Sequence, residues 1–262
     1  MKEHFRDAVE WIVQFRINPG FAEKRHELYR IAWQKLDDEV GGLAQSKFLS
    51  AAWKKDFIMA LRARPEMESF EVKDLLIQNC GACGRSGHPA RYVSPASSPC
   101  LGAVILTVHS YQMRFIGSPY FKKFMSDRFL EPVEIDSSDS QFDEDEDEEG
   151  DEDEDGNLVQ EESKSWFAGS VCHANAETAH TLIHWKMGLL NFVTEQLERS
   201  GYMSPDQLAK RQKMTPKKRH KQVDEILGKW ETDGTINSLH RAFKKTIEKA
   251  REQPTSGRYA RN

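Results

Sequence analysis

Several patterns that mark common protein classes are absent from this sequence. It contains no run of 18 apolar residues, so we predict no membrane-spanning helix. The first residues, MKEHFRDAVEWIVQF, have the spacing of an amphipathic helix rather than the charged-then-apolar order of a signal peptide. The G-x-S-x-G motif of serine hydrolases and the G-x-x-x-x-G-K-[ST] loop that binds nucleotide phosphates are also missing. We therefore expect no small-molecule substrate and no membrane partner.

Cysteine is scarce, with four in 262 residues, but two of the four form a C-x2-C pair, Cys80 and Cys83. Without a predicted secretory signal, such a pair favours metal binding over disulfides, and therefore a reducing compartment. His88 follows after four residues, and the stretch CGACGRSGHPARYV (80–93) resembles a C-x2-C-x4-H-x4-C zinc knuckle. Val93 occupies the position of the knuckle's last cysteine, so a fourth zinc ligand must come from elsewhere in the chain.

The remaining cysteines, Cys100 and Cys172, compete for the fourth ligand position. Cys172 lies in GSVCHANAE, a predicted junction between a strand and a helix. Pairing of two strands would bring this junction against the knuckle-like loop, so we prefer Cys172. His180 and His184 lie four residues apart on one predicted helix face and are further alternatives.

The two histidines also raise the question of an enzyme. His180 to His184 follow the H-x-x-x-H spacing of zinc peptidases, but Thr181 stands where the general-base glutamate belongs. The H-x-E half of the zinc deaminase motif is absent as well. Four protein ligands would leave no open position for water, so we predict a structural zinc and no enzymatic activity. A zinc hydrolase with an open metal site is the alternative.

The spacing of apolar residues predicts helices followed by a small sheet and then more helix. Helices are expected over 4–17, 22–40, 46–61, from Ser69 to Cys80, and over 175–199. Strands are expected over 91–93, 103–108 and 166–172, with a turn and a short helix over 115–124. The predicted fold class is α+β, mostly helical with a small antiparallel sheet, stabilised by zinc and followed by a C-terminal helical extension.

Charge is distributed unevenly along the chain. Twelve of the thirteen residues over 143–155 are acidic, and removing them raises the formal charge from −5 to +7. We expect a disordered acidic loop over 134–162, inserted into a zinc-clamped domain of residues 1–200. Residues 201–262 are predicted to form a basic helical extension with a frayed tail, and their PKKRHK cluster resembles a nuclear-import signal. We therefore predict a nuclear protein.

Three stretches together resemble a known family: AWQKLDDEVGGLAQSKFLSAAWKKDF, CGACGRSGHPARY and FAGSVCHANAETAHTLIHWKMGLL. They are similar to the domain of unknown function found in coiled-coil domain-containing protein 82 and in fungal nuclear proteins. The resemblance covers about the first two hundred residues. Its motifs fall on Cys80, Cys83, His88, Gly169, Cys172, His180 and His184. The resemblance implies a nuclear protein without established activity, and it favours Cys172 over Cys100 as a ligand.

These features predict a non-enzymatic nuclear interaction module that binds structural zinc through Cys80, Cys83, His88 and Cys172, and that acts in chromatin or transcription. The acidic loop would contact basic partners such as histones, while the basic C-terminal helices would serve import or contact phosphates. The alternative is direct nucleic-acid binding through the knuckle-like loop. Its charge and stacking surface would come from Arg85, Arg91 and Tyr92.

Overall fold

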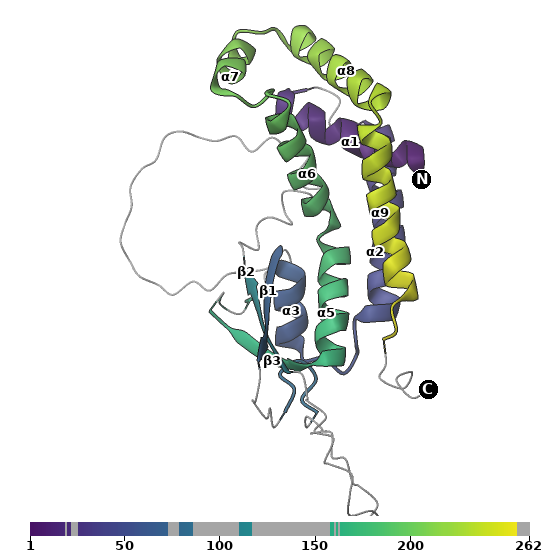
Figure 1. Cartoon of the computed structure of the whole chain (residues 1–262), viewed down its shortest axis with the longest axis vertical. Helices are drawn as coiled ribbons and strands as arrows, with labels where there is room; N and C mark the ends of the chain where they lie inside the picture. The colour runs from purple at the N-terminus through teal and green to yellow at the C-terminus, as the bar shows by residue number, and fades with distance from the viewer. Residues whose placement is uncertain are drawn as a thin grey trace, which may run out of the picture. The chain divides into compact units, whose positions relative to one another are not determined.

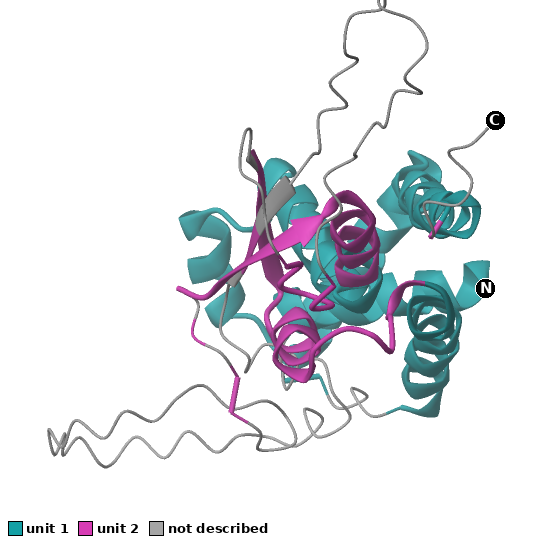
Figure 2. Cartoon of the chain, turned by 90° about the horizontal axis from the view of Figure 1, so that it is seen from below, with its two compact units in different colours: residues 1–47, 125–133, 181–254 teal, residues 48–124, 134–180, 255–262 magenta. Residues whose placement is uncertain are grey.

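A computed structural model describes residues 1–18, 20–21, 26–72, 79–85, 110–116, 158–159, 161 and 163–255. Helices dominate these residues, and three strands form one antiparallel sheet (Figure 1). The predicted class, mostly helical with a small antiparallel sheet, is confirmed. The chain divides into two compact units (Figure 2). Of the described residues, unit 1 holds 1–47 and 181–254, and unit 2 holds 48–116, 158–180 and Thr255.

Unit 1 is helical and is built around its first helix. Its helices are α1 (Lys2–Ile17), α2 (Glu27–Leu43), α6 (Trp185–Arg199), α7 (Pro205–Gln212), α8 (Pro216–Thr232) and α9 (Thr235–Glu252). Helix α1 packs against α2, α6, α8 and α9. One face of α1 is buried, and it includes Phe5, Ala8, Val9, Ile12 and Val13. Burial of this face organises the unit.

Helices α8 and α9, which lie beyond the predicted boundary between residues 200 and 201, pack against the first helix. Trp230 of α8 is 1% exposed, and Phe243 of α9 lies 5.1 Å from the Phe5 ring and 5.2 Å from the Trp185 ring, between centroids. These contacts join the predicted C-terminal extension to the N-terminal helices. The N-terminal helices and the helices after residue 200 therefore belong to the same compact unit, although they are far apart in the sequence.

Unit 2 combines a sheet of three strands with helices before and after it. The elements are the short π-helix η1 (Ala44–Phe48), α3 (Lys55–Ala63), β1 (Glu66–Val72), β2 (Ser110–Ile116), β3 (Ser165–Gly169) and α5 (Ser170–Ile183). The boundary between the units falls inside η1, and the last three residues of α5 belong to unit 1. The strand order is β1-β2-β3, and both pairs are antiparallel, with Glu66 opposite Ile116 and Gln112 opposite Phe167. The ring of Phe57 on α3 packs edge-on against Trp166 on β3 at 5.8 Å. This contact anchors the helix on the sheet.

One predicted element has the wrong type. A helix was expected from Ser69, but Glu66 to Val72 form β1, paired along its whole length with β2. Strand pairing with a distant segment satisfies the backbone of this stretch, and local helical spacing cannot reveal such a partner.

Other helix boundaries also differ from expectation. Gly41 and Gly42 lie inside α2 rather than ending it, and Ser46 lies in η1, where its hydroxyl donates to the Gly42 carbonyl at 2.7 Å. The single helix expected over 175–199 is two helices that break at His184. The strands predicted over 91–93 and 103–108 lie outside the described residues. Phe115 and Ile116, placed in a turn by the sequence, belong to β2.

Candidate metal centre

The C-x2-C pair lies in a tight turn that the backbone closes on itself. The Gly84 N–H donates to the Cys80 carbonyl at 2.7 Å, and the Cys80 N–H donates to the Arg85 carbonyl at 2.8 Å. Gly84 has φ +70°, a left-handed conformation that a residue with a Cβ adopts only with strain. The turn therefore needs a glycine, and it places both cysteine side chains within reach of one ion.

The turn is attached to the sheet through Gly81. Its N–H donates to the Phe167 carbonyl on β3 at 2.6 Å. A Cβ at Gly81 would lie 3.1 Å from the Phe167 oxygen and 3.2 Å from its nitrogen, closer than most real contacts. The Lys54 N–H donates to the Ala82 carbonyl at 2.7 Å, so the start of α3 holds the other side of the turn.

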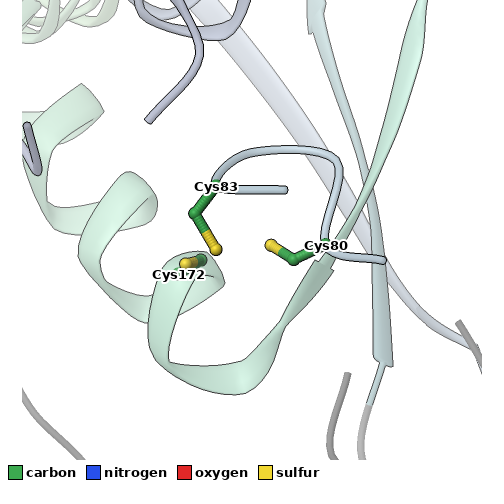
Figure 3. Close-up of side chains that lie close together, drawn as sticks. All are labelled: Cys80, Cys83 and Cys172. Carbon is green, nitrogen blue, oxygen red and sulfur yellow. The ribbon is translucent and has the colours of Figure 1, made fainter. Parts of the chain in front are cut away.

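Cys172 reaches the turn because β3 continues directly into α5. The strand ends at Gly169, the helix begins at Ser170, and Cys172 lies in the first helical turn. The Sγ atoms of Cys80, Cys83 and Cys172 lie within 4.8 Å of one another (Figure 3). The strand that holds Gly81 thus also delivers the third sulfur, as expected from the junction in the sequence.

Hydrogen bonds to the sulfurs distinguish the three thiols. The Cys172 thiol donates to Cys80, which lowers the pKa of Cys80 to about 4 and raises the pKa of Cys172 above its ordinary value. Backbone groups of Gly169 and Cys83 lower the pKa of Cys80 further, which identifies them as N–H donors to its sulfur. The Trp53 side chain, whose indole N–H is its only donor, lowers the pKa of Cys172. The surroundings therefore stabilise negative charge on the Cys80 sulfur, while Cys172 keeps its proton and donates it to that sulfur.

The arrangement fits a thiophilic metal ion such as Zn²⁺. Sulfurs that share one tetrahedral zinc lie about 3.8 Å apart, given a Zn–S bond of about 2.3 Å. The three sulfurs here lie within 4.8 Å of one another, so they would move closer by at most about 1 Å to reach that spacing. All three cysteines are free of disulfides. A structural zinc needs a fourth ligand, and among the described residues no further histidine, cysteine or carboxylate joins this cluster.

The other predicted zinc ligand, His88, and the alternatives Cys100, His180 and His184 are not part of the three-cysteine cluster of described residues. His88 and Cys100 lie outside the described residues. The buried His180 has its Nε2 3.0 Å from the Arg64 carbonyl oxygen, so this nitrogen is already engaged. His184 is buried at the break between α5 and α6. Neither histidine belongs to the cluster that includes Cys172.

Arg85, the described member of the proposed nucleic-acid-binding set, follows the turn with an exposed side chain. Arg91 and Tyr92 lie outside the described residues, as does nearly all of the acidic segment 134–162.

Sequence reasoning missed the N–H donors to the sulfurs. Trp53 falls within the helix expected over 46–61. It is 5% exposed, and its ring centroid lies 5.2 Å from that of Phe57. The sequence does not distinguish a tryptophan that only packs in the core from one that also donates a hydrogen bond to a cysteine. The backbone N–H of Gly169 is equally invisible to a side-chain pattern.

Comparisons with known proteins agree with a family resemblance but supply no activity. The chain is 21% identical over 203 residues to the uncharacterized protein C17H9.06c of Schizosaccharomyces pombe, an alignment that covers 76% of this chain. The chain spans about a quarter of the length of that curated relative. No solved structure matches. In the part of the chain that the structure describes, no helix has the length and apolar character to cross a membrane.

The family match covers the N-terminal part of the chain and one side of the metal centre. It contains Cys80, Cys83 and the position of His88, whereas Cys172 lies beyond it. The resemblance to a domain of unknown function is therefore confirmed: over residues 1–94 the chain matches the family described as "Domain of unknown function (DUF4211)".

Proposed function

We propose that Cys80, Cys83 and Cys172 bind one structural zinc ion, with His88 as the fourth ligand, and that the protein acts as a non-enzymatic interaction module. One observation carries the metal proposal: three sulfurs from two segments far apart in the sequence lie within 4.8 Å of one another. Lone buried cysteines are common, but three sulfurs brought together with N–H donors around them form a metal-ligand set.

The zinc would fasten the C-x2-C turn to the start of α5. The turn is attached to its surroundings by few backbone hydrogen bonds, among them those from Gly81 and Lys54. Binding free energy at a structural zinc site counts as folding free energy, on the order of 10 kcal/mol in zinc-finger peptides. Removal of zinc should therefore loosen unit 2 in particular.

The donor set favours a structural role over a catalytic one. Structural zinc sites typically use four cysteines, three cysteines with one histidine, or two of each. Catalytic sites typically use three ligands rich in histidine and carboxylate, with a water in the fourth position. Three cysteines with His88 would complete a set of the structural type. A zinc hydrolase would instead need a metal-bound water and only three protein ligands.

Metal content of the purified full-length protein tests this proposal. We expect one zinc per chain in the wild type and in the Cys100→Ala variant, which serves as the matched control. Cys172→Ala should lose most of the zinc at a competing chelator concentration that the wild type withstands. Equal zinc retention in Cys172→Ala and the wild type would remove Cys172 from the ligand set.

The proposed partners follow from charge. The acidic segment 143–155 has the charge to attract basic nuclear proteins such as histones. This binding should weaken as salt rises, because mobile ions screen the attraction between the two sets of charges. Binding of a histone-tail peptide, measured by calorimetry at low and at high NaCl concentration, checks this proposal. Affinity that does not change with salt would contradict it.

A second candidate function is nucleic-acid binding through the C-x2-C loop. The observation that favours it is the exposed side chain of Arg85 directly after the turn. Arg85→Ala and Arg91→Ala should weaken binding to a single-stranded oligonucleotide if the loop makes the contact. Unchanged binding in both variants would exclude this loop.

A further inference from the structure

A cluster of exposed lysines surrounds the turn between α7 and α8. We name it the basic corner, and it consists of Lys210, Lys213, Lys217, Lys218 and Lys221, all of which are exposed. The turn itself has three residues, 213–215, and joins the two helices directly (Figure 1). The whole corner belongs to unit 1, so it is separate from the cysteines of unit 2.

Two arginines hold the basic corner in one conformation. The buried Arg211 donates from Nη2 to the Tyr202 carbonyl. Arg219 donates from Nε to the Arg211 carbonyl at 3.1 Å and from Nη2 to the Gln212 carbonyl at 3.4 Å. These bonds connect α8 to the end of α7 and fix the turn between them. The lysines are therefore presented on a fixed backbone rather than on a flexible tail.

The two arginines leave their positive charge in place. Their hydrogen-bond acceptors are backbone carbonyls and the Met203 sulfur, none of which carries a compensating charge. Burial lowers the pKa of Arg211, and the charge of Arg219 lowers it further, as expected for two cations placed close together.

Most of the lysines form no ion pair with another described residue. Lys221 lies 3.8 Å from Glu225, but among the described residues no ion pair is formed by Lys210, Lys213, Lys217 or Lys218. Lys217 and Lys218 occupy the second and third positions of α8, whose first turn contains no acidic residue. Positive charge at the N-terminal end of a helix opposes the helix dipole and costs stability. Lysines, arginines and helix dipole thus add to one positive potential that suits an anion.

From this arrangement we propose that the basic corner binds the phosphate backbone of double-stranded nucleic acid. A short helix, a three-residue turn and a longer helix with an exposed basic first turn follow in the order of helix-turn-helix proteins, which present the second helix to a duplex. Lysines are flexible point charges that suit phosphates, and Arg219, which could read a base pair, is held by two carbonyls. Binding should therefore be independent of base sequence.

A lipid surface fits the basic corner less well. Interfacial helices insert an apolar face beside their cations. The apolar face of α8 is buried within unit 1 through Val223, Ile226, Leu227 and Trp230. Leu208 is the large apolar side chain that the described part of 205–221 exposes, at 40%. One such side chain does not make an inserting face.

Fluorescence anisotropy of the full-length protein with a labelled DNA duplex of about 20 base pairs and mixed sequence tests the proposal. Five lysine–phosphate contacts predict that affinity falls about 500-fold between about 50 and 200 mM NaCl, from a slope of about −0.9 per contact. Lys217→Ala with Lys218→Ala should reduce affinity about 60-fold at about 0.1 M salt and lower the slope by about 1.8. A second duplex of different sequence should bind equally well.

The matched control removes two exposed lysines from α9, Lys245 and Lys249, and should leave affinity nearly unchanged. Thermal unfolding by circular dichroism checks that both double variants fold like the wild type. An equal loss in both would overturn the proposal, because overall charge would then explain the binding. A loss of DNA affinity in Arg85→Ala, but not in the variant with Lys217→Ala and Lys218→Ala, would also overturn it. So would absent DNA binding accompanied by binding to phosphatidylserine vesicles. None of these outcomes affects the zinc proposal, which rests on other residues.

Discussion

At the scale of single residues, Gly81 shows how closely the turn that carries Cys80 and Cys83 approaches the backbone of β3. The turn that carries Cys80 and Cys83 touches β3 where a Cβ would meet the backbone of Phe167 at 3.1–3.2 Å. A backbone neighbour cannot rotate away as a side chain can. A side chain at residue 81 would therefore strain the hydrogen bond from Gly81 to Phe167.

Gly81→Ala should push the turn away from β3 and separate Cys80 and Cys83 from Cys172. We expect zinc affinity to fall at least about tenfold, measured by competition with a chromogenic chelator. Gly169→Ala is the matched control, because a Cβ there would have no heavy atom within 4 Å. Similar zinc affinity in both variants would show that the contact at Gly81 does not position the cysteines.

His240 makes the stability of unit 1 sensitive to pH. Its ring packs against Phe5 at 5.3 Å, and burial lowers its pKa, with further lowering by the charges of Lys244, Lys2 and the N-terminal amino group. Below the unfolded-state pKa of about 6.5, the unfolded chain therefore binds a proton more readily than the folded chain. The contribution of His240 to stability is present above that pH and is lost as the pH falls through the folded-state pKa.

The free energy of unfolding should consequently fall less between about pH 7 and pH 5 in His240→Gln than in the wild type. Urea titrations at several pH values measure this difference. Asn237→Gln, an exposed substitution on the same helix that changes no titratable group, should keep the wild-type pH slope and serves as the control. Parallel pH curves for His240→Gln and the wild type would contradict the assignment.

At the scale of elements, the sequence predicted the helices that bury a regular apolar stripe. A helix was expected over 4–17 from the spacing of its apolar residues, and four of these, Phe5, Val9, Ile12 and Val13, are buried. The sequence did not predict strand β1, because its partner strand β2 begins 38 positions after β1 ends and no local pattern indicates this pairing. The break at His184 was missed for a related reason, since apolar spacing continues through both α5 and α6.

The three-cysteine cluster was predictable to the extent that it depends on sequence spacing. Cys80 and Cys83 follow from the C-x2-C pattern, and Cys172 from its place at a predicted strand-to-helix junction. The strand expected over 166–172 ends earlier, at Gly169, so Cys172 lies in the first turn of α5. The hydrogen bonds of Trp53 and Gly169 to sulfur depend on tertiary packing, so no spacing indicates them. The choice of His88 as fourth ligand stays a prediction.

Helix α8 comes late in the sequence but packs against the first helix, α1, and so belongs to the same core. Its Trp230 is 1% exposed, and α8 packs against both α1 and α9. Trp230→Ala should lower the free energy of unfolding by about 3–5 kcal/mol, the usual effect of emptying such a buried site. Chemical denaturation measures this loss, and the adjacent exposed Lys229→Ala is the control. A change below about 1 kcal/mol would indicate that residues 201–252 are not part of the core of unit 1.

At the scale of the whole molecule, charge is divided between segments of opposite sign. The acidic residues over 143–155 are numerous enough that their removal takes the formal charge from −5 to +7. Net charge governs association with polyanions over distances of about 10 Å at 0.1 M salt. The acidic segment should therefore weaken any binding of DNA by the same chain.

Deletion of 143–155 should tighten DNA binding at least several-fold at about 0.1 M salt and speed association. Replacement of the segment by an uncharged Gly/Ser stretch of equal length separates charge from length and is the control. Anisotropy measurements on the three proteins give the comparison. If both altered proteins bind DNA as the wild type does, the acidic segment does not oppose the basic corner.

The central claim is that one zinc ion joins Cys172 to Cys80 and Cys83. Zinc K-edge X-ray absorption on the purified protein and on its Cys172→Ala variant tests it most directly, because the innermost shell of scatterers reports how many sulfurs bind the metal. The account predicts three sulfurs at about 2.3 Å with one lighter ligand in the wild type, and a shell of two sulfurs in any zinc that the variant retains. A wild-type shell with two sulfurs, or an unchanged shell in the variant, would contradict it.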